Sequence, residues 1–193
     1  MKPVIATLIL AVVIGLVSGG RLSGLSSLRL RWAPLALVGL GLQLFLPPGN
    51  WPLVLLMVSF VLLTIFAIRN LKVAGFPLVL VGLLMNFLVI GVNGGMPVPR
   101  HALEASDQKC QLQYLIDHVG AKHHLATSED TLMFLADVIP LGAPVRQAIS
   151  LGDIFAYVGV AQVVVAAMRT SPRGRPRTVG EGSATLEAVA PGG

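Results

Sequence analysis

Five apolar stretches that contain no Lys or Arg limit the fold of this chain more than any other feature. Each has between 14 and 18 residues, and the last holds one acid, Asp153, near its start. In a bilayer every backbone polar group needs an internal partner, and continuous apolar runs favour helices over the alternating strands of a barrel. The sequence therefore predicts an all-α, polytopic membrane protein with five transmembrane helices. The spans are expected at about 4–18, 32–46, 53–68, 76–92 and 151–168.

The composition supports a membrane protein. Hydrophobic residues make up 54% of the chain and charged residues 12%, whereas a soluble domain carries about 25% charged residues. Such an apolar chain is not a disordered one either. The single cysteine, Cys110, excludes an internal disulfide and a multi-cysteine metal site, and no role is assigned to it.

The basic residues predict the orientation of the helices. Nine of the fourteen fall after the first, third and fifth spans, and by the positive-inside rule these segments are cytoplasmic. We therefore expect a multi-pass protein of the cell membrane with its N-terminus outside, residues 93–150 outside, and its C-terminus in the cytoplasm. The membrane domain would comprise residues 1–168. The nine residues are Arg21, Arg29, Arg31, Arg69, Lys72, Arg169, Arg173, Arg175 and Arg177.

The two ends of the chain allow further expectations. Residues 169–193 resemble a disordered basic tail that would lie near anionic lipid headgroups, and no motif indicates a nucleic-acid partner. The first apolar stretch follows Lys2 and ends at Ser18-Gly19-Gly20, so a cleaved signal peptide is an alternative. The charges of the later loops favour an uncleaved helix.

The external segment 93–150 holds all four histidines and six of the nine acids, and is where chemistry is expected. Its mixed composition predicts short interfacial helices. One would follow Pro99 and end near residue 105, and another would begin at Glu129, capped by Thr127 or Ser128, and run to about Val138. A turn is expected at residues 141–144.

Two acids bracket that turn. Asp137 lies among apolar residues, where desolvation would raise its pKa, although it could also face water on a helix surface. Asp153 follows Ser150 by three residues, which is the spacing of a capping box, yet an acid one turn into a span is also a candidate functional group. If the turn brings both together, they can share a proton and act as general acid and base.

A third element, Asn93-Gly94-Gly95, follows the fourth span. The glycines permit a positive φ, so the element predicts a helix C-cap and a tight turn, while the Asn side chain could bind a ligand. The candidate site thus has Asp137 and Asp153 as catalytic residues, with Asn93, Gly94, Gly95 and Ser150 as substrate-binding residues.

A resemblance adds to this reading. Asp137-Val138-Ile139 and Ser150-Leu151-Gly152-Asp153 at the start of the last helix resemble the end of lipoprotein signal peptidase, an intramembrane aspartic peptidase, and Asn93-Gly94-Gly95 is similar to an external element of that family. The resemblance implies that Asp137 and Asp153 are the catalytic pair, with Ser150 in place of an Asn. Two helices of that family are missing between these elements. The whole chain looks more like a family of small uncharacterised bacterial membrane proteins, which share Asn-Gly-Gly-x-Pro and a Gly-Asp.

Other groups give weaker signals. His118, His123 and His124 lie near acids, but their spacing matches no helical metal pair, so neither a metal nor a cofactor is predicted. Polar residues within the spans are expected to bond between helices, and small ones to permit close helix contact. The polar residues are Gln43, Asn86 and Gln162, and the small residues are Gly39, Gly41 and Gly82.

Two functions follow. The first is a membrane-embedded aspartic hydrolase that acts on a lipid-linked or membrane-anchored substrate. The alternative is a non-enzymatic membrane subunit or accessory protein. In that case its external segment would bind a membrane protein partner through the apolar clusters at 112–116 and 132–135.

Overall fold

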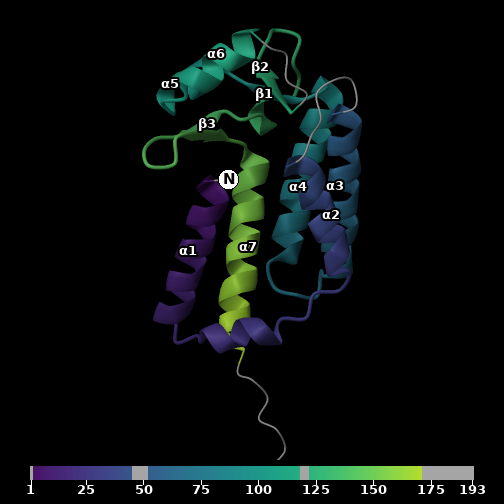
Figure 1. The fold of residues 1–193 in the computed structure, drawn as a ribbon, viewed down its shortest axis with the longest axis vertical. Helices are drawn as coiled ribbons and strands as arrows, with labels where there is room; N and C mark the ends of the chain where they lie inside the picture. Colours follow the sequence, from purple (N-terminus) through teal and green to yellow (C-terminus); the bar gives the residue numbers. More distant parts are fainter. Residues whose placement is uncertain (1, 45–51, 118–121, 171–193) are drawn as a thin grey trace, which may run out of the picture.

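The structure is a computed structural model that describes residues 2–44, 52–117 and 122–170. Long helices occur where the five apolar stretches predict them (Figure 1). The bounds differ from the prediction by about two residues at each end. The helices are α1 (Lys2–Val17), α2 (Ala33–Leu44), α3 (Pro52–Arg69), α4 (Phe76–Asn93) and α7 (Leu151–Arg169).

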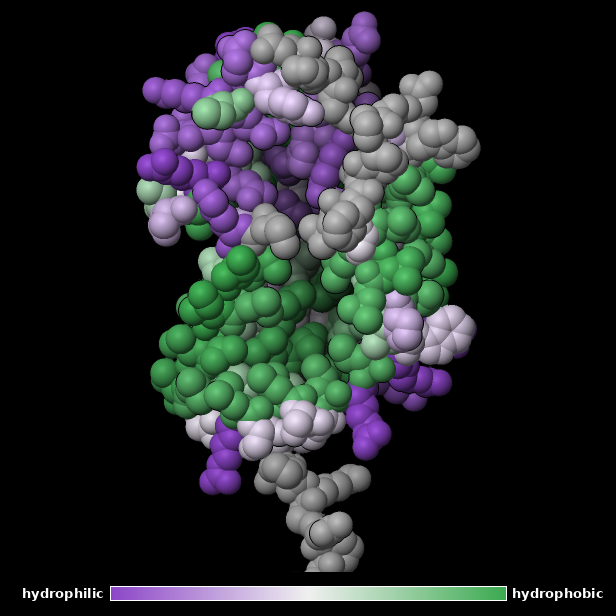
Figure 2. Space-filling view, in the orientation of Figure 1, coloured by the Kyte–Doolittle hydropathy of each residue, from purple (hydrophilic) through white to green (hydrophobic). Residues whose placement is uncertain are grey.

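Three of these helices, α3, α4 and α7, are long and apolar enough to cross a membrane, with 18, 18 and 19 residues. At 1.5 Å per residue each is about 27 Å long, close to the thickness of the hydrocarbon core. Helices α1 and α2 are shorter, at 16 and 12 residues, so their crossing stays a prediction. The surface over the helices forms an apolar band with hydrophilic regions at both ends (Figure 2).

The helices pack as an open row. Helix α7 packs against α1 on one side and α4 on the other, α4 packs against α3, and α3 pairs with α2. At the lower end in Figure 1, the short 3-10 helix η1 (Leu22–Ser27) packs against the end of α7. The backbone N–H of Arg21 donates to the Met168 carbonyl at 2.8 Å. This places the first basic loop beside the C-terminal end of α7.

Glycines set the helix spacing. A Cβ at Gly82 of α4 would lie 2.7 Å from the Ala156 backbone N of α7, and one at Gly39 of α2 would lie 2.9 Å from the Leu63 side chain of α3. These two contacts confirm the expectation of close helix packing. The expectation was wrong for Gly41, because no described atom lies within 4 Å of its Cβ position.

The loops after α1 and α3 meet at the end opposite residues 94–150. The Asn70 side chain accepts from the Arg31 backbone N–H and donates to the Arg31 carbonyl, both at 2.8 Å. The Arg69 guanidinium lies over the Trp32 ring, 4.3 Å from its centroid. The basic residues of these two loops therefore gather at one end of the helices, as the orientation argument requires.

Residues 94–117 and 122–150 form a cap over the other end of the helices (Figure 1). The cap contains α5 (Arg100–Ala105), α6 (Lys109–Asp117) and the 3-10 helix η2 (Met133–Leu135). It also has four strands that the all-α prediction missed. Strand β1 (Met96–Val98) pairs in parallel with β2 (His123–Leu125), and β3 (Ile139–Leu141) pairs antiparallel with β4 (Gln147–Ile149).

Local predictions in the cap had mixed outcomes. Helix α5 follows Pro99 as expected, and the expected turn at 141–144 connects β3 to β4. The prediction of a helix from Glu129 to Val138 was wrong. The Asp130 carboxylate accepts from the Thr127 backbone N–H at 2.7 Å, and Leu132 has a φ of 55°. These features form a loop, and η2 is the one helical turn in this segment.

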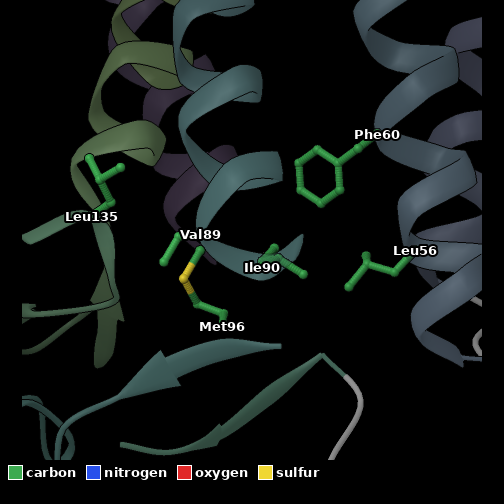
Figure 3. Packing of buried hydrophobic residues seen from close by; sticks show 6 residues of the cluster. All are labelled: Leu56, Phe60, Val89, Ile90, Met96 and Leu135. Atoms are coloured by element: carbon green, nitrogen blue, oxygen red, sulfur yellow. The ribbon is translucent and has the colours of Figure 1, made fainter. Parts of the chain in front are cut away.

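An apolar cluster joins the cap to the helices (Figure 3). Leu56 and Phe60 of α3 face Ile90 of α4, and Met96 of β1 extends toward Val89. Leu135 of η2 completes the cluster and is 5% exposed. Because Asp137 follows two residues later, this cluster fixes the position of the predicted acid.

The close contact of α4 with α7 gives a first prediction. Gly82→Ala should destabilise the protein by about 1–3 kcal/mol, since overpacking of a tight interface has that cost. Gly41→Ala is the matched control, and should be neutral or stabilise the protein by up to about 1 kcal/mol because Ala favours helix. Thermal unfolding of both variants in detergent measures the effect. Equal stability of the two variants would contradict the inferred packing.

Candidate functional site

The start of α7 is held by a capping box. Ser150 accepts from the Asp153 backbone N–H at 3.0 Å through its side chain, and Asp153 accepts from the Ser150 backbone N–H at 3.2 Å. The predicted capping role of these two residues is confirmed. Ser150 is fully buried, so its predicted contact with a substrate stays a prediction.

Asn86 of α4 joins this cap to the neighbouring helix. Its Nδ2 donates to Asp153 Oδ1 at 2.8 Å, and its Oδ1 accepts from the Ser150 hydroxyl at 3.0 Å. The expected polar bond between helices is therefore confirmed for Asn86. Each oxygen of the Asp153 carboxylate accepts one hydrogen bond, which fixes the orientation of the group.

The Asn93-Gly94-Gly95 element ends α4 and anchors the cap. Gly94 has a φ of 68°, and its N–H and that of Gly95 both donate to the Ile90 carbonyl. The Asn93 side chain donates to the Thr131 carbonyl at 3.0 Å and accepts from the Thr131 N–H at 2.8 Å. The predicted C-cap is confirmed, and the substrate-binding role of these three residues stays a prediction.

Strand β1 positions the second acid. The Asp137 backbone N–H donates to the Pro97 carbonyl at 3.2 Å, and the Met96 N–H donates to the Lys122 carbonyl at 2.9 Å. Since His123 is paired with Met96 in the parallel ladder, His123 and Asp137 are both held by the same strand. Sequence patterns could not predict this arrangement, because it depends on a parallel pairing of two three-residue strands.

The Asp137 side chain is buried and only partly paired. The residue is 5% exposed. Its Oδ2 lies 3.4 Å from His123 Nε2, while its Oδ1 is buried with no hydrogen-bond partner in the described part of the chain. A buried polar atom without a partner is costly, and each such atom in a folded protein needs an explanation.

Asp137 belongs to a group of interacting charges. Burial raises the pKa of Asp137, and the hydrogen bond and charge of His123 oppose this rise. The charge of Asp153 raises the pKa further, and the charge of Lys122 lowers it. Lys122 is exposed, but protein atoms around its ammonium group remove part of its hydration and lower its pKa, while Asp153 and Asp137 raise it. The two predicted catalytic acids and one cation are therefore within electrostatic reach of one another.

A half-enclosed cavity of about 210 Å³ lies beside Asp137 in the cap. His123 also lines the cavity, with a side chain 33% exposed. Three glutamine side chains add hydrogen-bonding groups to its wall. They are Gln108, Gln111 and Gln147. The sequence could not predict this cavity, since its lining residues come from β1, α5, α6, β2 and β4 and from the segments between these elements.

The histidines do not gather into a metal site within the described residues. His123 pairs with Asp137, and His124 Nε2 lies 2.8 Å from Asp130 Oδ1, so the two adjacent histidines have different partners. Desolvation raises the pKa of Asp130, but bonds from Thr127 and His124 outweigh it and leave the pKa lowered. His118 lies outside the described residues, and Cys110 is exposed.

Comparison with known proteins places the chain in a family. The model of a family of unknown function, DUF5317, matches residues 26–165. The chain belongs to this family. It is similar to an uncharacterised protein of Thermotoga maritima, with 34% identity over 128 residues, which are 62% of this chain and 71% of that protein. No solved structure matches. The matched region contains both acids and the whole cap of this DUF5317 member.

The unpaired Asp137 gives a prediction about pH. A carboxyl whose pKa is raised by folding favours its protonated form, so the folded state loses stability as pH rises above the ordinary Asp value of about 3.9. Asp137→Asn should therefore be more stable than the parent at pH 7, by about 1–3 kcal/mol. The difference should vanish near pH 4.

Thermal unfolding between pH 4 and 8 in detergent measures this difference. Asp107→Asn is the control, because Asp107 is 54% exposed in its side chain and should show no such pH dependence. An Asp137→Asn protein that is less stable than the parent throughout this range would refute the prediction.

Proposed function

We propose that this DUF5317 protein is a membrane-embedded hydrolase with its acid–base site at the outer membrane surface. In this proposal all five long helices cross or enter the membrane, the cap lies outside, and residues 171–193 follow α7 into the cytoplasm. Two observations support this orientation. The apolar band separates the cap from the opposite end of the helices, and the loops with Arg31 and Arg69 lie together at that end (Figure 2).

The single cysteine allows a direct test of this topology. Cys110 is exposed on α6 of the cap, so in spheroplasts it should react with a membrane-impermeant maleimide. The control replaces Cys110 by Ser and Ser26 of η1 by Cys, which should react after the membrane is lysed and not before. If intact spheroplasts label the Ser26→Cys variant and do not label Cys110 of the parent, the orientation is the reverse of the proposed one.

The observation that carries the chemical proposal is the buried, partly unpaired Asp137 within electrostatic reach of Asp153. Asp137 in its protonated form donates a hydrogen bond to the scissile carbonyl. Asp153 is the base that activates water, and its two oxygens have lone pairs beyond those used by Asn86 and Ser150. Two carboxyls in different environments can divide acid and base roles in this way.

The reaction follows ordinary hydrolysis. Water attacks the carbonyl carbon of an ester or amide, its proton moves to Asp153, and Asp137 protonates the carbonyl oxygen. Collapse of the tetrahedral intermediate breaks the bond to the leaving group, which takes the proton from Asp153, and the carbonyl re-forms as its hydroxyl proton returns to Asp137. Asn86 and Ser150 hold Asp153 in position during these steps.

A lipid-linked or membrane-anchored substrate fits the arrangement of the helices. The row of helices is open, and Figure 2 shows that its apolar surface is recessed between the α1 and α7 side and the α2 and α3 side. An acyl chain or apolar segment could lie there while its polar part reaches the cap. The bilayer would supply the substrate from the side.

The test uses proteoliposomes that contain membrane-anchored ester and amide reporters. Asp137→Asn and Asp153→Asn should each reduce hydrolysis by a factor of at least about 100, the lower range for loss of a general acid or base. Asp107→Asn in the cap is the matched control and should retain full activity. Thermal stability is measured for each variant, because Asp153 also caps α7. If both variants fold and act as the parent does, the hydrolase proposal fails.

A second candidate function has its own observation. In the cap, Phe134 is 66% exposed and Ile116 is 48% exposed, although Leu115 and Leu135 beside them are buried. Exposed apolar side chains at this level could contact a membrane protein partner, which would make the chain a non-enzymatic subunit. Phe134→Ser would then abolish co-purification of a partner, while both Asp→Asn variants would retain it.

A further inference from the structure

The wall of the cavity beside Asp137 has an apolar part and a polar part. One part is aliphatic and comes from Val98, Leu103, Leu115 and Ala148. The other part carries three primary carboxamides, Gln108, Gln111 and Gln147, next to His123 and Asp137. A pocket with an apolar lining and a few convergent polar groups is typical of a small-ligand site.

The Asp137 side chain gives a second indication, independent of the lining, that the cavity binds a ligand. The residue is 5% exposed and lines the cavity, and its Oδ1 has no hydrogen-bond partner among the described residues. The backbone of Asp137 is already bonded, since its N–H donates to the Pro97 carbonyl at 3.2 Å. A ligand group that reached the carboxyl would supply the missing bond.

The charges around the cavity disfavour ionic ligands. No Lys or Arg belongs to its described lining, so an anion such as a phosphate would face the Asp137 carboxyl without a cation to bind it. A cation would lack an anionic partner, because burial raises the pKa of Asp137 and so favours its uncharged form, while His123 already lies 3.4 Å from its Oδ2. The balance of charge favours an uncharged ligand.

The glutamine carboxamides indicate that the uncharged ligand carries an amide group. A glutamine side chain presents a donor and an acceptor side by side, which match the C=O and N–H of an amide. Gln108 is already oriented, since its Nε2 donates to Ser106 Oγ at 2.9 Å and leaves its Oε1 as an acceptor. No Phe, Tyr or Trp ring, on which a sugar could stack, belongs to the described cavity wall.

From these features we propose that the cavity is a binding site for an uncharged, amide-bearing ligand, with Gln111 and Gln147 as its main hydrogen-bonding partners. Gln111 is on α6 and Gln147 is on β4, so the ligand would bridge the two sides of the cap. The proposal rests on the proposed function in one respect: the ligand would be the polar part of the substrate, brought next to Asp137.

The experiment measures binding without turnover. Full-length protein in nanodiscs, with ¹⁵N-labelled glutamine side chains, is titrated with N-acetyl-alanyl-alanine amide, inorganic phosphate and putrescine in separate runs. The capped dipeptide should shift glutamine amide resonances in a saturable way. Phosphate and putrescine should bind at least tenfold more weakly.

Variants make the assignment specific. Gln111→Leu and Gln147→Leu should each weaken dipeptide binding at least tenfold. Gln113→Leu is the matched control on the same helix, because Gln113 does not line the cavity, and it should bind as the parent does. Gln111 is exposed and Gln147 half-buried, and a thermal melt verifies that each variant is folded.

The outcomes separate this proposal from the hydrolase proposal. Asp153→Asn should retain dipeptide binding even where it abolishes hydrolysis. If the parent protein binds the dipeptide and hydrolyses none of the membrane-anchored reporters, the binding site is supported and the hydrolase proposal is refuted. If the dipeptide does not bind, if phosphate or putrescine binds as well, or if the two glutamine variants bind like the parent, the site is overturned whatever the hydrolysis assay shows.

Discussion

The contact between α4 and α7 determines the rest of this structure. The chain enters the cap at the end of α4 and leaves it at the start of α7, so the distance between these helices sets the base of the cap. Gly82 and Gly152 permit the close approach, and Asn86 then reaches both Ser150 and Asp153. With a larger spacing, Asp153 would lose its bond to Asn86, and an acid with fewer partners one turn into an apolar helix is costly.

The two acids of the candidate site differ in the hydrogen-bond partners that their carboxyl oxygens have. Asp153 accepts a hydrogen bond on each oxygen and has a structural role as a cap. Asp137 has a 3.4 Å contact with His123 on one oxygen and no hydrogen-bond partner in the described chain on the other. A fixed carboxylate beside a buried carboxyl of raised pKa is the asymmetry that acid–base chemistry requires. In the proposed hydrolase, the same bonds that make Asp153 a cap would also hold it in position as the base.

Sequence reasoning succeeded where the information was local. Continuous apolar runs located the helices, Ser150 and Asp153 located a capping box, and the glycines after Asn93 located a C-cap. It failed where the structure depends on contacts between residues that are far apart in the sequence. Asn86 and Asp153 are 67 residues apart, and the three-residue strands β1 and β2 are too short for a period of two to be visible. The expected helix at 129–138 failed because the Asp130 side chain bonds back to Thr127 and forms a loop.

The burial of Asp137 is imposed by its neighbours. Thr131 is fixed by Asn93, Leu135 is inserted into the apolar cluster of α3 and α4, and the Asp137 N–H is bound to Pro97. These three anchors within seven residues restrict any local shift of the backbone that would carry the side chain into water. An Asn or Leu at this position would avoid a buried, unpaired carboxyl oxygen. A buried acid with an unpaired oxygen at a rigid site is the pattern expected of a functional group, and here it faces a glutamine-lined cavity of the cap.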